Sequence, residues 1–117
     1  MSRREYIHFL NDIKDCSKNI LEYVSGKSFE QFLGNRMLID AVMRNIEIIG
    51  EAVKNLPAKV RSKHPRIEWK RLAGLRDIVI HHYFGLDYQV IWDIVQKDIP
   101  DLVPKIEEVI AAETKGR

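Results

Sequence analysis

The sequence has little cysteine, no long hydrophobic run and no strong excess of either charge. Its single cysteine, Cys16, cannot form a disulfide within the chain, and no Cys/His spacing typical of structural zinc occurs. No stretch approaches the ~18 consecutive apolar residues of a membrane-spanning helix. Residues 1–6 also lack the apolar segment of a signal peptide. We therefore expect a chain that stays in the reducing cytoplasm and does not enter a membrane.

The length and the charge leave the choice of partner open. The chain has 117 residues, 45% hydrophobic and 31% charged, which predicts a single globular domain over residues 1–117. Nineteen basic residues against 17 acidic ones give a net charge of +2, so nucleic acid is neither required nor excluded as a partner. A local concentration of basic side chains would be enough for contact with RNA.

Apolar residues recur at helical spacing along most of the chain, and no strand-length alternation is present. Residues 3–25 predict a first helix that ends at Gly26. Ser28, followed three residues later by glutamine, is the pattern of a capping box for the next helix, which continues to about Leu56 with a break near Gly34. The apolar residues of this second helix lie on more than one side, which indicates several packing partners and hints at a second chain.

The second half of the chain predicts shorter helices. Residues 57–65 begin and end with proline, so we expect one turn of helix there at most, before a third helix over residues 69–80. Asp87 is a candidate N-cap, and Asp98 with Pro100 indicates a cap and a new start for the last helix. The fold class is therefore all-α: an up-and-down bundle of four main helices with short extra helical segments.

The most informative residues are Arg76, His81 and Tyr83, which are separated by four residues and then by one. Arginine stays charged at biological pH and can bind two phosphate oxygens at once. Histidine is the side chain best suited to move a proton near neutral pH. The spacing can bring a cation, a base and a phenol into one small volume, and these groups suffice to cleave RNA without a metal.

In such a reaction His81 takes the proton from a 2′-hydroxyl or gives one to the leaving 5′-oxygen, while Arg76 stabilises the charge of the transition state. The expected product is a 2′,3′-cyclic phosphate. The competing interpretation of Arg76 is an ordinary surface ion pair. Asp77 could orient Arg76 or His81, or it could simply be solvated. An Asp77–His81 metal pair lacks a third ligand, and His82 is better explained as a structural or surface histidine, so we expect no metal and no cofactor.

The motif resembles the R-x4-H-x-Y signature of the HepT-like ribonuclease toxins in the HEPN superfamily, and Arg76, His81 and Tyr83 match it completely. The resemblance covers nearly the whole chain and implies a HEPN-like helical bundle. The segments that resemble the family's long second helix, the lead-in to its motif and its last helical region are residues 38–52, 67–76 and 88–102.

The resemblance also implies partners and regulation. HEPN ribonucleases act as homodimers, which would bring a second Arg76 and a second His81 into one cleft. In HepT-like toxins the motif tyrosine receives AMP from a cognate nucleotidyltransferase antitoxin of the MntA type. The resemblance therefore implies that Tyr83 is adenylylated and that the added phosphate and adenine block the cleft.

One basic stretch is a candidate for contact with the RNA backbone, although a solvated loop would explain it equally well. The residues in this prediction are Lys59, Arg61, Lys63, Arg66, Lys70 and Arg71.

Two other functions stay open from the sequence. In a non-catalytic nucleotide-binding or partner-docking module, Arg76 and Tyr83 would hold a nucleotide without cleaving anything. A small metal-dependent hydrolase would use Asp77, His81 and His82.

Overall fold

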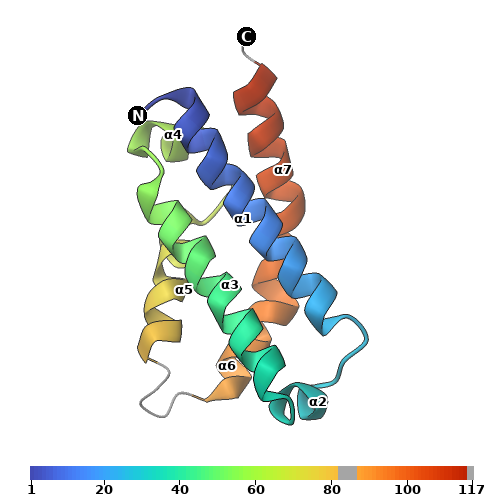
Figure 1. Ribbon diagram of the computed structural model, residues 1–117. Coiled ribbons are helices and arrows are strands. Elements are labelled where there is room, and N and C mark those ends of the chain that lie inside the picture. Colours follow the sequence, from blue (N-terminus) through green and yellow to red (C-terminus); the bar gives the residue numbers. More distant parts are fainter. Residues whose placement is uncertain (82–86, 116–117) are drawn as a thin grey trace.

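The computed structural model describes residues 1–81 and 87–115, and within them four long helices form a bundle (Figure 1). Successive long helices run in opposite directions, which confirms the predicted all-α, up-and-down arrangement with short extra segments. The long helices are α1 (Arg3–Val24), α3 (Arg36–Asn55), α5 (Trp69–His81) and α7 (Ile99–Lys115). The short ones are α2 (Phe29–Leu33), α4 (Ala58–Lys63), α6 (Tyr88–Asp93) and the π-helical segment η2 (Ile94–Asp98).

Helix α3 packs against both α1 and α5, so it needs apolar residues on more than one side. Ile46 and Ile49 are fully buried in the core, and Ile48 is half-buried. Two partners within the chain therefore account for the breadth of this apolar surface. The apolar residues of this helix therefore no longer indicate contact with a second chain.

The local signals for helix ends are largely confirmed. Ser28 and Gln31 form a complete capping box at the start of α2, and Asp87 caps α6 by accepting a hydrogen bond from the Gln89 amide. Gly26 follows the end of α1 with a φ of +73°, a conformation that glycine adopts without strain. The break expected near Gly34 separates α2 from α3, and the Asn35 side chain caps α3.

One expected helix length and one expected cap were wrong. Helix α4 has six residues, which exceeds the single turn allowed between the two prolines. The last helix α7 begins at Ile99 with Pro100 in its first turn, as expected, but Asp98 does not cap it, because the helical backbone continues from α6 through η2 without a break. The π-helical segment keeps the backbone bonded up to Pro100, with the Ile99 amide donating to the Ile94 carbonyl. The Asp98 carboxylate binds Arg71 instead of capping a helix, at 2.8 Å.

The shape of the bundle places the motif helix away from the termini. The molecule is elongated, with principal dimensions of 47 × 28 × 21 Å. The start of α1 and the end of α7 lie at one end, while α2 and α6 lie at the other, and α5 runs toward that second end (Figure 1). None of the described helices is long and apolar enough to cross a membrane.

Candidate active site

Arg76 lies where α5 crosses α3, and its backbone touches the backbone of Gly50. A Cβ atom placed on Gly50 would lie 2.7 Å from Arg76 Cβ and 2.9 Å from Arg76 N, which is closer than real side chains come. Glycine at this position therefore allows the two helices to approach at Arg76. The sequence interpretation missed Gly50, although an isolated glycine inside a helical pattern is a recognised signal of close packing.

His81 is the last residue of α5 and is exposed, whereas Arg76 is half-buried. On a regular helix, residues five apart point about 140° away from each other and lie ~7.5 Å apart along the axis. Within one chain, α5 thus brings Arg76 and His81 to neighbouring turns but directs them to different sides. No hydrogen bond or ion pair holds either side chain among residues 1–81 and 87–115.

Asp77 is exposed and pairs with Lys54 of α3, with 3.4 Å between Lys54 Nζ and Asp77 Oδ1. It lies four residues before His81 and therefore on the same side of α5. The pair ties α5 to α3 one turn from the Gly50 contact. Since both side chains are largely solvated, we expect this tie to be weak.

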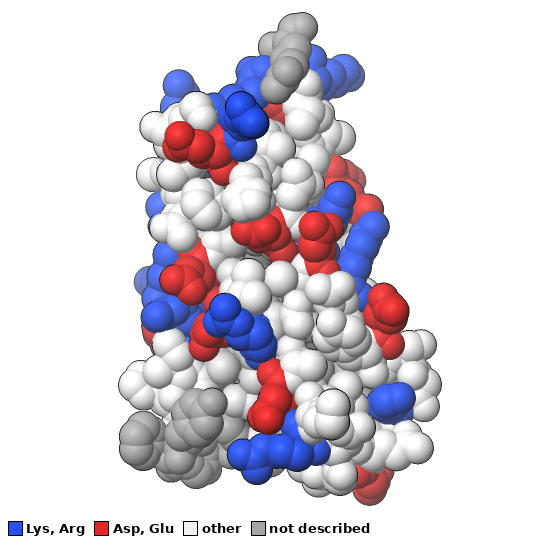
Figure 2. Space-filling model, in the orientation of Figure 1, with Lys and Arg blue, Asp and Glu red and all other residues white. Residues whose placement is uncertain are grey.

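A groove of about 350 Å³ lies between α3 and the last turn of α5, beside the motif. Its floor is apolar, formed by Met43, Val79 and Ile80. Arg36, Asp40, Arg44 and Glu47 line its rim, where each arginine pairs with one of the acids. Figure 2 shows the same mixing more widely, since basic and acidic side chains alternate over the face it presents.

The predicted basic stretch is not a free basic surface, because acids of the last helical region pair with several of its members. Arg66 binds Glu108 and Arg71 binds Asp98, each at 2.8 Å. Lys63 lies 3.6 Å from Glu113. The Arg61 side chain is half-buried, and its Nε is shielded from solvent without a hydrogen-bond partner among the described residues. Lys59 and Lys70 are exposed and form no ion pair with the described residues.

Arg71 and Arg76 lie on different sides of α5, since Arg71 turns to η2 and Arg76 contacts α3. The basic stretch and the motif therefore do not form one continuous cationic surface on this helix. The prediction that Arg71 contacts RNA would require it to leave Asp98.

Tyr83 and His82 lie outside the described residues, so the adenylylation site and the alternative Asp77–His81–His82 metal set have no geometry here. Within residues 1–81 and 87–115, no three His, Cys, Asp or Glu side chains gather closely enough to hold a metal ion.

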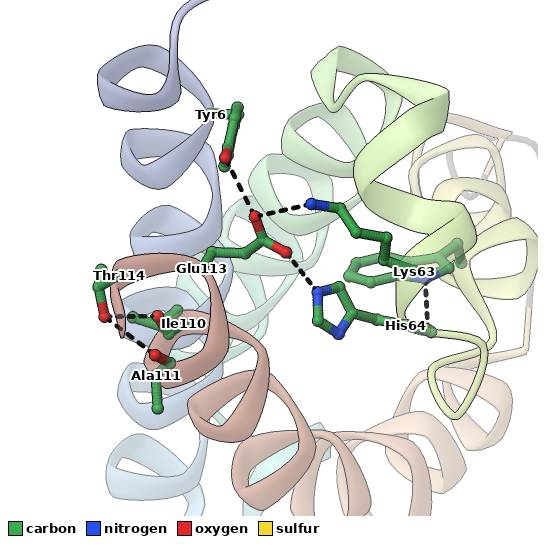
Figure 3. Close-up of polar contacts among 8 residues, drawn as sticks. Tyr6, Lys63, His64, Ile110, Ala111, Glu113 and Thr114 are labelled. Carbon is green, nitrogen blue, oxygen red and sulfur yellow. Dashed lines mark hydrogen bonds and ion pairs between the residues drawn. The ribbon is translucent and has the colours of Figure 1, made fainter. Parts of the chain in front are cut away.

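The sequence interpretation missed a polar cluster around the buried Glu113 side chain, at the end of the bundle that holds the termini (Figure 1). Figure 3 shows its members. The Glu113 carboxylate, 6% exposed, accepts a hydrogen bond from the Tyr6 hydroxyl at 3.0 Å and contacts His64 Nε2 at 2.6 Å. The Lys63 ammonium group forms an ion pair with the same carboxylate, at 3.6 Å. Burial raises the pKa of Glu113, but the hydrogen bonds from His64 and Tyr6 and the charge of Lys63 outweigh it and hold this pKa below its ordinary value.

The sequence signal for this cluster is a charged residue at an apolar helical position. Leu102, Ile106 and Val109 form the buried stripe of α7, and Glu113 continues the same spacing. Its contacts with α1 and α4 make it a structural tie between three helices, distant along the fold from the motif.

Comparison with known proteins agrees with the resemblance seen in the motif. The family model described as "Ribonuclease HepT-like" matches residues 13–109. A protein named "Putative RNase" from Methanocaldococcus jannaschii is 44% identical over 110 residues, which cover 94% of this chain and 91% of the relative. Another protein named "Putative RNase", from Caldanaerobacter subterraneus, is 43% identical over 110 residues, which cover 94% of this chain and 96% of the relative.

A "Probable ribonuclease HepT" from Thermococcus cleftensis is 41% identical over 107 residues, which cover 92% of this chain and 97% of that protein. No solved structure matches the chain significantly. The family match and these relatives extend over the bundle and include the motif helix α5. The chain therefore belongs to the HepT-like ribonuclease family.

Proposed function

We propose that the protein is the toxin of a toxin–antitoxin pair and acts as a metal-independent endoribonuclease. Membership of a ribonuclease family supports RNA as the substrate. The observation that carries the assignment of residues is Arg76, a half-buried cation that the described residues leave without an ion pair. Such a guanidinium is available for a phosphate, in contrast to Arg66 and Arg71, which are neutralised by acids.

The proposed reaction is an attack within the RNA chain. The 2′-oxygen forms a bond to phosphorus while the bond from phosphorus to the 5′-oxygen breaks, which yields a 2′,3′-cyclic phosphate and a 5′-hydroxyl. His81 accepts the proton of the 2′-hydroxyl or delivers one to the leaving oxygen. Arg76 stabilises the extra negative charge on the phosphorane-like transition state.

A homodimer would supply the second proton-transfer group. One chain directs Arg76 and His81 to different sides of α5, and a single histidine does not easily act as base and acid at once. A two-fold dimer would place a second His81 and a second Arg76 in the same cleft. We therefore propose that the active species is a dimer with a shared site.

Regulation by a cognate nucleotidyltransferase antitoxin of the MntA type completes the proposal. Tyr83, two residues after His81, is the proposed acceptor of AMP. The attached phosphate would compete with RNA for Arg76, and the adenine would obstruct the cleft. Both effects favour an inactive toxin while the antitoxin is present.

The test is RNA cleavage in EDTA by protein whose intact mass shows no added AMP, with the oligomeric mass measured in solution. We expect a dimer that cleaves RNA, and loss of cleavage by about 10²-fold or more in His81→Ala and Arg76→Ala. Matched controls are His8→Ala and Arg4→Ala, which remove an exposed histidine and an exposed arginine from α1 and should cleave like the wild type.

The outcomes separate the candidate functions. Cleavage that needs a divalent metal would favour the metal-dependent hydrolase. No cleavage by unmodified protein that still binds nucleotides through Arg76 would favour the non-catalytic binding module. A monomer with full activity would overturn the shared site while leaving the ribonuclease activity in place.

A further inference from the structure

Gly50 stands in the interior of a 20-residue helix, where glycine weakens helix formation relative to alanine. The residue is buried, and its position faces Arg76 across the contact between α3 and α5. Glycine in such a place calls for a local reason, and the close approach of the two backbones is that reason.

The atoms that a side chain at position 50 would meet are rigid ones. The distances from an added Cβ are 2.7 Å to Arg76 Cβ, 2.9 Å to Arg76 N and 3.2 Å to Arg76 Cα. None of these atoms belongs to the flexible end of a side chain, so rotation of the guanidinium cannot relieve the overlap. Helix α5 itself would have to move away from α3 at Arg76.

We propose that Gly50 is a positioning residue for Arg76 in the ribonuclease reaction. The steric contact sets the depth at which α5 sits on α3, and thereby the point from which the Arg76 guanidinium reaches the scissile phosphate. The nearby Lys54–Asp77 pair is long and solvated, so it cannot hold this position alone. The inference rests on the proposed role of Arg76 and adds a residue that never touches RNA.

The variant that tests it is Gly50→Ala, and the chain offers a matched control in Gly74→Ala. Gly74 lies on α5, two residues before Arg76, and an added Cβ there would meet nothing within 4 Å. Both changes add one methyl group in a helix, but only the first one displaces Arg76. Val109→Ala, in the buried stripe of α7, is a second control for general loss of stability.

We expect Gly50→Ala to lower kcat by roughly tenfold to a hundredfold, since a displacement of about 1 Å can have such an effect, with little change in KM. Gly74→Ala should keep the wild-type kcat, and Val109→Ala should keep it at temperatures where it is folded. In two-dimensional NMR spectra the Arg76 backbone amide should shift in Gly50→Ala and not in Val109→Ala. In an Arg76→Ala background, Gly50→Ala should cause no further loss of kcat.

The kcat values of these variants distinguish a positioning role of Gly50 from a general structural role and from failure of the proposed function. A wild type that does not cleave RNA, or an Arg76→Ala variant as active as the wild type, would overturn the proposed function and this inference with it. An inactive Arg76→Ala together with a fully active Gly50→Ala would overturn the positioning role alone. A folded Gly50→Ala whose loss adds fully to that of Arg76→Ala would show a general structural role instead.

Discussion

Arg71 and Arg76 are five residues apart on one helix, yet their side chains have different surroundings. A hydrogen bond and the charge of Asp98 raise the pKa of Arg71 and occupy its guanidinium. Arg76 has no such partner among residues 1–81 and 87–115, and its backbone is held against Gly50. The same residue type is therefore paired with an acid at one position and has no ion pair with the described residues at the other.

The reactivity of the Cys16 thiol also depends on its surroundings. Burial, followed by the charges of Asp12 and Asp15, raises the pKa of the Cys16 thiol to about 11. The thiolate is the reactive form, so at pH 8 the folded protein should react with a thiol reagent at least tenfold more slowly than a free cysteine. Rapid labelling of the folded protein would contradict the burial, and full labelling in denaturant is the control.

At the scale of the helices, some helix ends follow from the local sequence, whereas others depend on contacts with other helices. Ser28 and Asp87 start helices through side-chain hydrogen bonds that the local sequence predicts. The continuous passage from α6 through η2 into α7 was not predictable from Asp98 and Pro100, because a π-helical turn and a partner on α5 override the local signals for a break.

Two glycine-to-alanine changes should therefore have opposite effects on stability. Gly26 has a φ of +73° with open space around it, so Gly26→Ala should destabilise the protein by about 1 kcal/mol through backbone strain alone. Gly74 lies in a helix with room for a methyl group, so Gly74→Ala should stabilise by about 0.5–1 kcal/mol. Denaturant unfolding measures both, and effects of equal sign would show that the assigned backbone conformations are wrong.

At the scale of the whole molecule, Glu113 connects α1 and α4 to α7 through the polar contacts that Figure 3 shows. Its contacts with Tyr6, Lys63 and His64 join segments up to 107 residues apart in the sequence. Because its folded-state pKa is lowered, the carboxylate stabilises the fold at pH values above the unfolded pKa of about 4.3. This contribution is lost as the pH falls through the folded-state pKa.

Glu113→Gln should therefore lower the free energy of unfolding by about 1–3 kcal/mol at pH 7, since it removes charge-assisted hydrogen bonds from a buried site. The difference from the wild type should begin to shrink as the pH falls below the unfolded pKa, and it should vanish below the folded-state pKa, where the wild-type carboxyl is neutral in both states. Urea unfolding at pH 7, 5 and 3.5 measures this trend. Exposed Glu108→Gln is the control, and a difference that does not depend on pH would refute the role of the charge.

The sequence by itself determined the helices, most of their ends and the motif, because helical periodicity, caps and residue spacing are local properties. Only the tertiary structure decided that Gly50 touches Arg76, that Asp98 occupies Arg71 and that Glu113 is a buried acceptor. These contacts join residues more than 20 positions apart, and they depend on how each helix is rotated and how deeply it sits against its neighbour. That rotation and depth follow from packing of the whole core, which local sequence patterns do not encode.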